Sequence, residues 1–245
     1  MQATHFWNKF ALHRNKVALL FLFTLLSASL SGQGFRWARQ HNPNYDERKI
    51  SYGFLIGIHT SGYQVNTSEK FVTQSFDTLQ SVMAPFSPGF SLGFLINLRI
   101  NSDLDLRITP KAGFFQHELQ FNFTDLTQQT QLVETTMVEF PILLKYKSMR
   151  RGNVRMYMIG GINPSVEASG KNDIQSTTEI IDIKTTNLTL EAGMGFDFYF
   201  PLFKFSQEIR FSRGITNMLG SDPSSFSEPL VRLNTNTIAV YFIFQ

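Results

Sequence analysis

Between residue 51 and the end of the chain, several runs place apolar side chains at every second position. In the segment 138–147, one series is apolar throughout, whereas the alternating series carries Glu139, Lys145 and Lys147. Runs of this kind, about ten residues long, predict β-strands with one apolar face. Eight such runs follow the N-terminal region, and no helical repeat occurs among them. They occupy residues 51–60, 88–99, 104–114 (continued after a bulge at 119–123), 138–147, 154–161, 188–200, 203–211 and 238–244.

The connections between these runs alternate between short and long. Residues 100–102, 148–152 and 200–202 form the short connections, and the other four are longer, the first of them spanning residues 61–87. Short turns at one end and long loops at the other are typical of a bacterial outer-membrane barrel with an even number of strands. We therefore expect an all-β fold, an eight-stranded antiparallel transmembrane β-barrel with short periplasmic turns and long extracellular loops.

A soluble eight-stranded barrel would show the same alternation with its apolar face turned inward. The glycines favour the membrane barrel, because glycine weakens a strand and a barrel this narrow has little room inside. They share the face that carries the charges: Gly53, Gly57, Gly93, Gly113, Gly161, Gly193 and Gly195. The apolar face holds too many bulky side chains for such a lumen, and 25 residues of the chain are Phe. We therefore expect the apolar face to contact lipid.

This assignment places charges of both signs inside the barrel. Buried charges persist only when they are paired and hydrogen-bonded, so we predict a salt-bridge network that plugs the lumen. Its expected members are Arg99, Asp103, Asp105, Arg107, Lys111, Glu139, Lys145, Arg155, Glu191, Asp197, Glu208 and Arg210. Pro141 lies on the same inward face, where its missing N–H predicts a bulge or a strand end.

The N-terminal residues indicate export. His13, Arg14 and Lys16 precede the apolar run 17–26 and a stretch of small residues, which is the pattern of a secretory signal peptide. We expect residues 1–32 to be removed, 33–50 to form a periplasmic segment and 51–245 to form the barrel in the cell outer membrane. Three of the 22 basic residues and none of the 19 acidic ones lie in 1–32, so the formal charge of +3 falls to zero. This balance excludes nucleic-acid binding on bulk charge.

Candidate catalytic chemistry is sparse. No motif of a hydrolase, a nucleotide site or a metal site occurs at a useful spacing. We therefore expect no enzyme activity, no cofactor, no metal and no small-molecule substrate. One alternative is a constellation at the extracellular rim that uses His117 with Glu118, for which an ordinary polar pair is the simpler interpretation. Asp103 and Asp105 fit the salt-bridge network better than a catalytic dyad.

Two features of the sequence are candidates for contact with a partner on the periplasmic side. The turn after residue 147 is strongly basic and carries no acid, and Lys147, Arg150 and Arg151 form a candidate docking patch for a periplasmic partner. A simpler interpretation assigns these cations to the lumen and to lipid phosphates. The segment 35–49 is aromatic and charged but too short to fold alone, so it either docks or remains flexible.

The runs NPNYDERKISYGFLIGIHT (42–60) and VEFPILLKYKSMRRGNVRMYMIGGINPSVE (138–167) resemble the PorT family of Bacteroidota outer-membrane barrels. The resemblance covers essentially the whole chain after the signal peptide. It implies a non-enzymatic component of the type IX secretion apparatus, which exports gliding adhesins and secreted enzymes, with other secretion-system proteins as partners. It implies no catalytic residues. The family's label of translocating porin conflicts with eight strands, which leave no channel for a folded protein.

Two other functions stay open beside a secretion component that acts through protein contacts. The first is a general structural or adhesion barrel of the OmpA/OmpX kind, which would work through its surface loops. The second is a small outer-membrane hydrolase that depends on His117.

Overall fold

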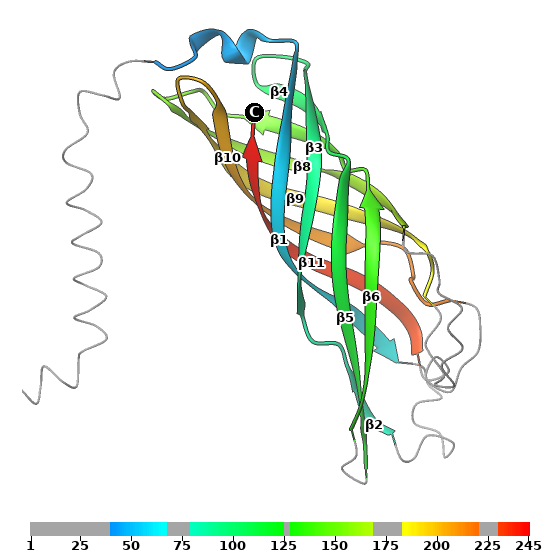
Figure 1. Cartoon of the computed structure of the whole chain (residues 1–245). Helices are drawn as coiled ribbons and strands as arrows, with labels where there is room; N and C mark the ends of the chain where they lie inside the picture. Colours follow the sequence, from blue (N-terminus) through cyan, green and yellow to red (C-terminus); the bar gives the residue numbers. More distant parts are fainter. Residues whose placement is uncertain (1–39, 68–78, 125–127, 169–182, 221–229) are drawn as a thin grey trace, which may run out of the picture. The chain divides into compact units, whose positions relative to one another are not determined.

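The computed structural model describes residues 40–67, 79–124, 128–168, 183–220 and 230–245. The expected signal peptide, 1–32, and the first part of the expected periplasmic segment, 33–39, lie outside these ranges. Residues His41–Gln245 form one compact unit, in which a short 3-10 helix, η1 (Pro43–Glu47), precedes the strands (Figure 1). No helix in the described part of the chain is long and apolar enough to cross a membrane.

The strands form a single closed antiparallel sheet. In chain order they are β1 (Ile50–Thr67), β2 (Leu79–Met83), β3 (Ser87–Arg99), β4 (Leu104–Ile108), β5 (Lys111–Phe123), β6 (Gln128–Glu139), β7 (Ile142–Lys147), β8 (Val154–Glu167), β9 (Thr186–Tyr199), β10 (Lys204–Gly214) and β11 (Leu230–Phe244). Each long strand pairs with its neighbours in sequence, and β1 pairs with β11 to close the ring. Because β4 continues into β5 and β6 into β7, the described residues form an eight-stranded barrel, as the alternation predicts.

Two prolines interrupt these composite strands. Pro110 separates β4 from β5, and Pro141 separates β6 from β7. Their carbonyl groups still take part in the ladder, because Phe94 N–H donates to Pro110 O at 2.9 Å and Thr109 N–H donates to Pro141 O at 3.1 Å. The missing donor N–H therefore breaks the strand locally without opening the sheet. The predicted strand end at Pro141 is confirmed.

The three expected short turns lie together at one end of the barrel, which we call the short-turn end, and η1 and the C-terminus lie there as well (Figure 1). We call the opposite end of the barrel the long-loop end, and residues 68–78, 169–182 and 221–229 lie outside the described part. The prediction of a long loop after residue 123 is wrong, because β5 and β6 extend the ladder as far as the pair Asn122↔Gln128. This hairpin reaches beyond the neighbouring strands (Figure 1).

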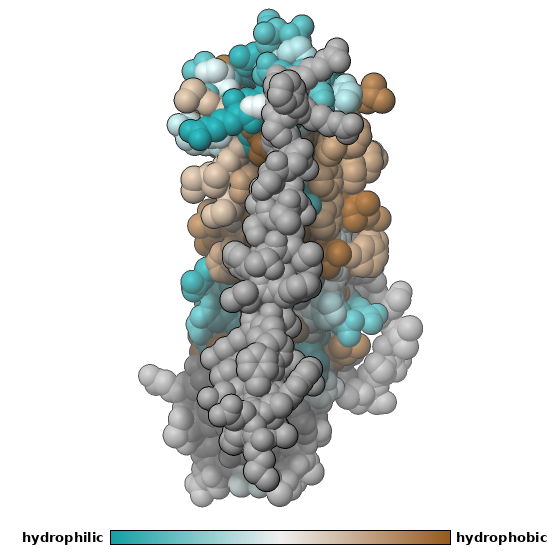
Figure 2. Space-filling view, turned by 90° about the vertical axis from the view of Figure 1, so that its left-hand side faces the viewer, coloured by the Kyte–Doolittle hydropathy of each residue, from teal (hydrophilic) through white to brown (hydrophobic). Residues whose placement is uncertain are grey.

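Outward and inward positions alternate as predicted. Tyr52 and Phe94 on the outer face are 67% and 71% exposed, whereas Leu55 and Lys145 on the inner face are buried. Figure 2 shows the result as an apolar belt between polar ends. A belt of this kind suits hydrocarbon, because the closed sheet satisfies its backbone polar groups internally.

The lumen is not charged along its whole length. The predicted bulge before residue 119 is absent, since the β5–β6 register runs unbroken from Lys111 to Asn122. The side chains of Leu119 and Phe121 therefore point inward and are fully buried, which corrects their placement on the lipid face. They join an apolar cluster near the long-loop end with Tyr63, Met218, Leu230 and Leu233.

Phe94→Arg tests the lipid belt. We expect this change to lower the free energy of unfolding by roughly 2–4 kcal/mol, because it places a charge within the hydrocarbon. The matched control is Leu202→Arg, at a turn residue that is 92% exposed, where the cost should be at most about 1 kcal/mol. Reversible urea unfolding in lipid vesicles measures both variants. Equal costs would contradict the position of Phe94 in the belt.

Candidate functional site

The lumen near the short-turn end is filled by charged side chains. Of the twelve residues predicted to form the network, two are exposed, Arg99 and Asp103. Their predicted burial is wrong, because Arg99 is the last residue of β3, at the mouth of the lumen, and Asp103 lies in the turn that precedes β4. The other ten are buried: Asp105, Arg107, Lys111, Glu139, Lys145, Arg155, Glu191, Asp197, Glu208 and Arg210.

Glu208 is the centre of this network. Its carboxylate accepts a hydrogen bond from Arg107 Nη1 at 2.6 Å and another from the Tyr157 hydroxyl at 2.6 Å. It also pairs with Arg210, which reaches Glu191 at 3.2 Å. When a buried carboxylate accepts several charge-assisted hydrogen bonds, these bonds offset the hydration that the carboxylate and its partners lose on burial.

Two further pairs extend the network towards the short-turn end. Lys145 Nζ lies 2.6 Å from an oxygen of Asp197, which also accepts a hydrogen bond of 2.5 Å from Ser206. Lys147 Nζ lies 2.6 Å from Asp105 Oδ1. Lys147 was assigned to the docking patch, but it is buried at the last inward position of β7. It therefore belongs to the lumen.

Tyrosine rings separate the cations of the network. Lys145 Nζ lies 3.6 Å from the centroid of the Tyr157 ring, and the Arg210 guanidinium lies 4.5 Å from that of Tyr241. Tyr157 fits because it faces Gly195 across the sheet, where a Cβ atom would lie 2.6 Å from its hydroxyl oxygen. The sequence analysis missed these tyrosines as partners of the charges, although their parity places them on the inward face.

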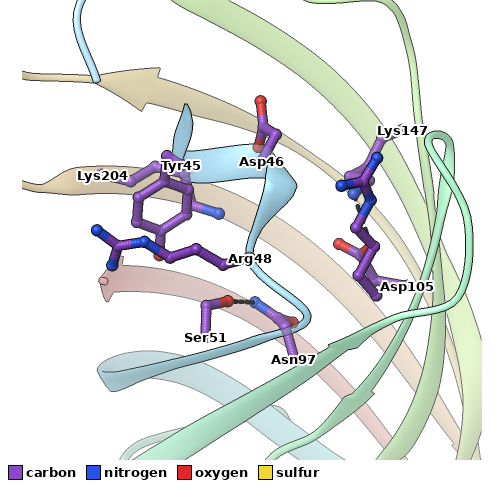
Figure 3. A pocket seen from close by; sticks show the side chains of 9 residues that line it. Tyr45, Asp46, Arg48, Ser51, Asn97, Asp105, Lys147 and Lys204 are labelled. Atoms are coloured by element: carbon purple, nitrogen blue, oxygen red, sulfur yellow. Dashed lines mark hydrogen bonds and ion pairs between the residues drawn. The ribbon is translucent and has the colours of Figure 1, made fainter. Parts of the chain in front are cut away.

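A short segment, His41–Arg48, closes the short-turn end, and we call it the strap. Tyr45 of η1 is buried between Lys204 and Arg48, whose charged groups lie 4.5 Å and 5.1 Å from its ring centroid (Figure 3). Burial raises the pKa of the Tyr45 phenol above its ordinary value, so the ring is neutral at physiological pH. Lys204 is a buried cation that the sequence analysis did not include.

Asp46 supplies the second anchor of the strap. The Tyr199 hydroxyl donates to both carboxylate oxygens of Asp46, at 2.8 Å and 2.9 Å. Arg155 Nη1 lies 3.3 Å from Asp46 Oδ2. Residues 41–48 of the expected periplasmic segment therefore contact the chain's own barrel, whereas residues 33–39 lie outside the described part.

Arg150 supplies the third anchor. Its guanidinium donates to the carbonyl oxygens of His41 and Asn42 and lies 3.7 Å from the centroid of the Tyr199 ring. Of the three residues in the predicted docking patch, Arg151 is exposed, whereas Lys147 is in the lumen and Arg150 binds the strap. The patch is therefore not a continuous free surface, because the chain's own N-terminal segment occupies part of it.

A small polar pocket remains beneath the strap (Figure 3). Four cations and two carboxylates line it, so its surface favours water or an anion over an apolar ligand. The lining residues are Tyr45, Asp46, Arg48, Ser51, Asn97, Arg99, Asp105, Lys147 and Lys204. Within the described residues, no cluster of three or more side chains could hold a metal ion.

The proposed pair of His117 and Glu118 does not form a constellation. His117 is buried in the lumen against Tyr63, with 4.2 Å between ring centroids, and its Nδ1 has no hydrogen-bond partner among the described residues. Glu118 is on the opposite face of β5, since adjacent residues of a strand point to opposite sides, and it accepts a hydrogen bond from Gln120. The placement of His117 at a solvent-exposed rim is therefore wrong.

Glu208→Gln tests the network. We expect it to lower the free energy of unfolding by about 3–5 kcal/mol, because it leaves two buried guanidinium groups without their shared carboxylate. Glu47→Gln, at an exposed position of the strap, is the matched control and should change stability by less than about 0.5 kcal/mol. Urea unfolding in vesicles measures both. A small effect of Glu208→Gln would mean that water hydrates the lumen.

Gly195→Ala tests the space that Tyr157 needs. The added methyl group would meet the tyrosine ring and the carbonyl of Gln207, each at 2.6 Å, so we expect a loss of about 1–3 kcal/mol from overpacking. Gly160→Ala is the control, because its Cβ would have Glu191 O as its nearest neighbour, at 3.6 Å. Unfolding midpoints of the two variants compare them directly, and equal midpoints would contradict this role for Gly195.

A family model described as outer membrane protein beta-barrel domain matches residues 33–220. No curated protein matches the chain. Similar solved structures include OprG from Pseudomonas aeruginosa (12% identity, TM-score 0.48, covering 80% of this chain and 94% of OprG). Neisserial surface protein A (11%, 0.41, 80% and 98%) and Ail of Yersinia pestis (12%, 0.34, 80% and 98%) are two others.

The family match spans most of the 245 residues. It agrees with the closed antiparallel ring and with the apolar belt on its outer surface. The chain therefore belongs to the outer membrane protein beta-barrel domain family, and it is a small barrel of the outer membrane.

Proposed function

We propose that this protein is a non-enzymatic component of a type IX secretion apparatus that acts through contacts with other secretion-system proteins and not as an open pore. The observation that carries the proposal is the closed short-turn end, where a buried ion-pair network fills the lumen and the strap covers it. The resemblance of residues 42–60 and 138–167 to the PorT family supplies the secretion context.

The short-turn end is the surface on which the proposal depends. In outer-membrane barrels, short turns face the periplasm, where the other parts of an export apparatus meet the outer membrane. Here the turn after β7 presents Met149, which is 79% exposed, beside the exposed Arg151. An apolar side chain beside a free cation suits a protein contact, since interfaces are enriched in Met and Arg.

Export measurements test this proposal. The variant Met149→Ser/Arg151→Gln removes the exposed pair and leaves the buried Lys147 and the strap contact of Arg150 intact. We expect the barrel to insert normally, as shown by heat-modifiable gel mobility, and export of type IX cargo to fall at least about tenfold, since loss of about 1.4 kcal/mol of binding weakens a contact by that factor.

The matched control changes one cation and one apolar residue at the long-loop end, Arg213→Gln/Val231→Ser, both of which are exposed. It should leave export unchanged. Normal export by the Met149→Ser/Arg151→Gln strain would overturn the role of the short-turn surface. Reduced surface binding by the long-loop variant alone would favour the adhesion barrel instead.

A further inference from the structure

The buried charges of the lumen do not balance. Among the described residues, seven buried cations face five buried carboxylates. The cations are Arg107, Lys111, Lys145, Lys147, Arg155, Lys204 and Arg210, and the carboxylates are Asp105, Glu139, Glu191, Asp197 and Glu208. Since unpaired buried charge is costly, the barrel has a demand for anions that its own strands do not meet.

The surplus is concentrated at the short-turn end. Arg155 finds its carboxylates only outside the buried set, with Asp46 of the strap at 3.3 Å and the exposed Asp103 at 3.7 Å. Lys204 lies 4.0 Å from Asp197, whose oxygen already pairs with Lys145 at 2.6 Å. The opening of the lumen at the short-turn end, which we call the short-turn mouth, is therefore a cationic site. A carboxylate from outside the barrel strands completes it.

The strap fills this site through side chains and carbonyl oxygens and not as a strand of the sheet. Asn42, which precedes η1, adopts a left-handed backbone conformation (φ 48°), and no side chain caps the helix. Tyr45 enters between two cations, Asp46 reaches Arg155 and Tyr199, and Arg150 binds the carbonyl groups of His41 and Asn42. Such a segment can leave without breaking the barrel, because the ring of strands closes without it.

We propose that the short-turn mouth is a binding site for an acidic, aromatic-containing peptide segment of a periplasmic partner, and that the strap occupies this site in the free barrel. The strap defines the chemistry of the occupant: an aromatic ring that packs against Lys204, followed by a carboxylate for Arg155 and Tyr199. This inference rests on the proposed function in so far as the short-turn end is the surface that partners use.

Exchange of the strap for a partner has a measurable consequence. A site that is open only a small fraction of the time binds a ligand with an affinity reduced by that fraction. Releasing the strap should therefore strengthen binding in trans. Because the contacts lie near the surface, binding should also weaken as salt screens the charges.

The experiment uses the full-length protein in lipid nanodiscs and a fluorescent peptide with the sequence of residues 41–48, HNPNYDER. We expect the strap variant Tyr45→Ala/Asp46→Asn to bind this peptide at least about tenfold more tightly than the wild-type protein. Glu47→Gln, which changes the neighbouring exposed acid, should bind like wild type. A peptide with Asn in place of its aspartate, and the strap variant carrying Arg150→Gln, should both lose this gain.

The outcomes separate the two proposals. Equal binding by wild type and strap variant, or equal binding of the aspartate and asparagine peptides, overturns the mouth site whatever the export result. Peptide binding as expected, together with normal export by the Met149→Ser/Arg151→Gln strain, supports the site while overturning the secretion role of the turn. If the strap variant fails to insert, the single change Asp46→Asn replaces it, because it removes only the strap's carboxylate and should also strengthen binding of the peptide.

Discussion

The electrostatics of a narrow barrel interior governs the rest of this structure. Eight strands enclose a lumen only wide enough for side chains, so an inward charge is buried between the walls and must find its partner there. Glu208, with Arg107, Arg210 and Tyr157 around it, shows how one carboxylate can satisfy several neighbours at once. The network fills the space that a pore would need.

Glycine and tyrosine make this arrangement sterically feasible. A buried lysine or arginine needs a neighbour that fills the lumen and also interacts favourably with its positive charge. A tyrosine meets both conditions through its ring and its hydroxyl group. Tyr157 needs the missing side chain of Gly195. Towards the long-loop end the charges give way to an apolar cluster around Leu119 and Phe121, so the two ends of the lumen differ in chemistry.

The strap connects the network to the proposed function. The barrel strands contribute more buried cations than carboxylates, and the N-terminal segment supplies one of the missing acids through Asp46. A barrel that is filled inside and completed by a peptide segment at its mouth is suited to recognising polypeptides at that end. This interpretation agrees with a component that assembles with other proteins, and it requires no passage through the lumen.

The sequence by itself determined the strands, the lipid-facing side and most of the buried charges, because a period of two residues separates the faces of a strand wherever the register is unbroken. Parity alone placed Asp197 and Arg210 correctly. The ends of strands were less certain, which is why Arg99 and Asp103 were assigned to the lumen and the β5–β6 hairpin to a loop. Only the tertiary structure decided the partners of each charge, the burial of Lys147 and the docking of Tyr45 and Asp46. Those contacts join residues far apart in the chain, 153 positions in the case of Asp46 and Tyr199, and closure of the barrel, not any local pattern, brings them together.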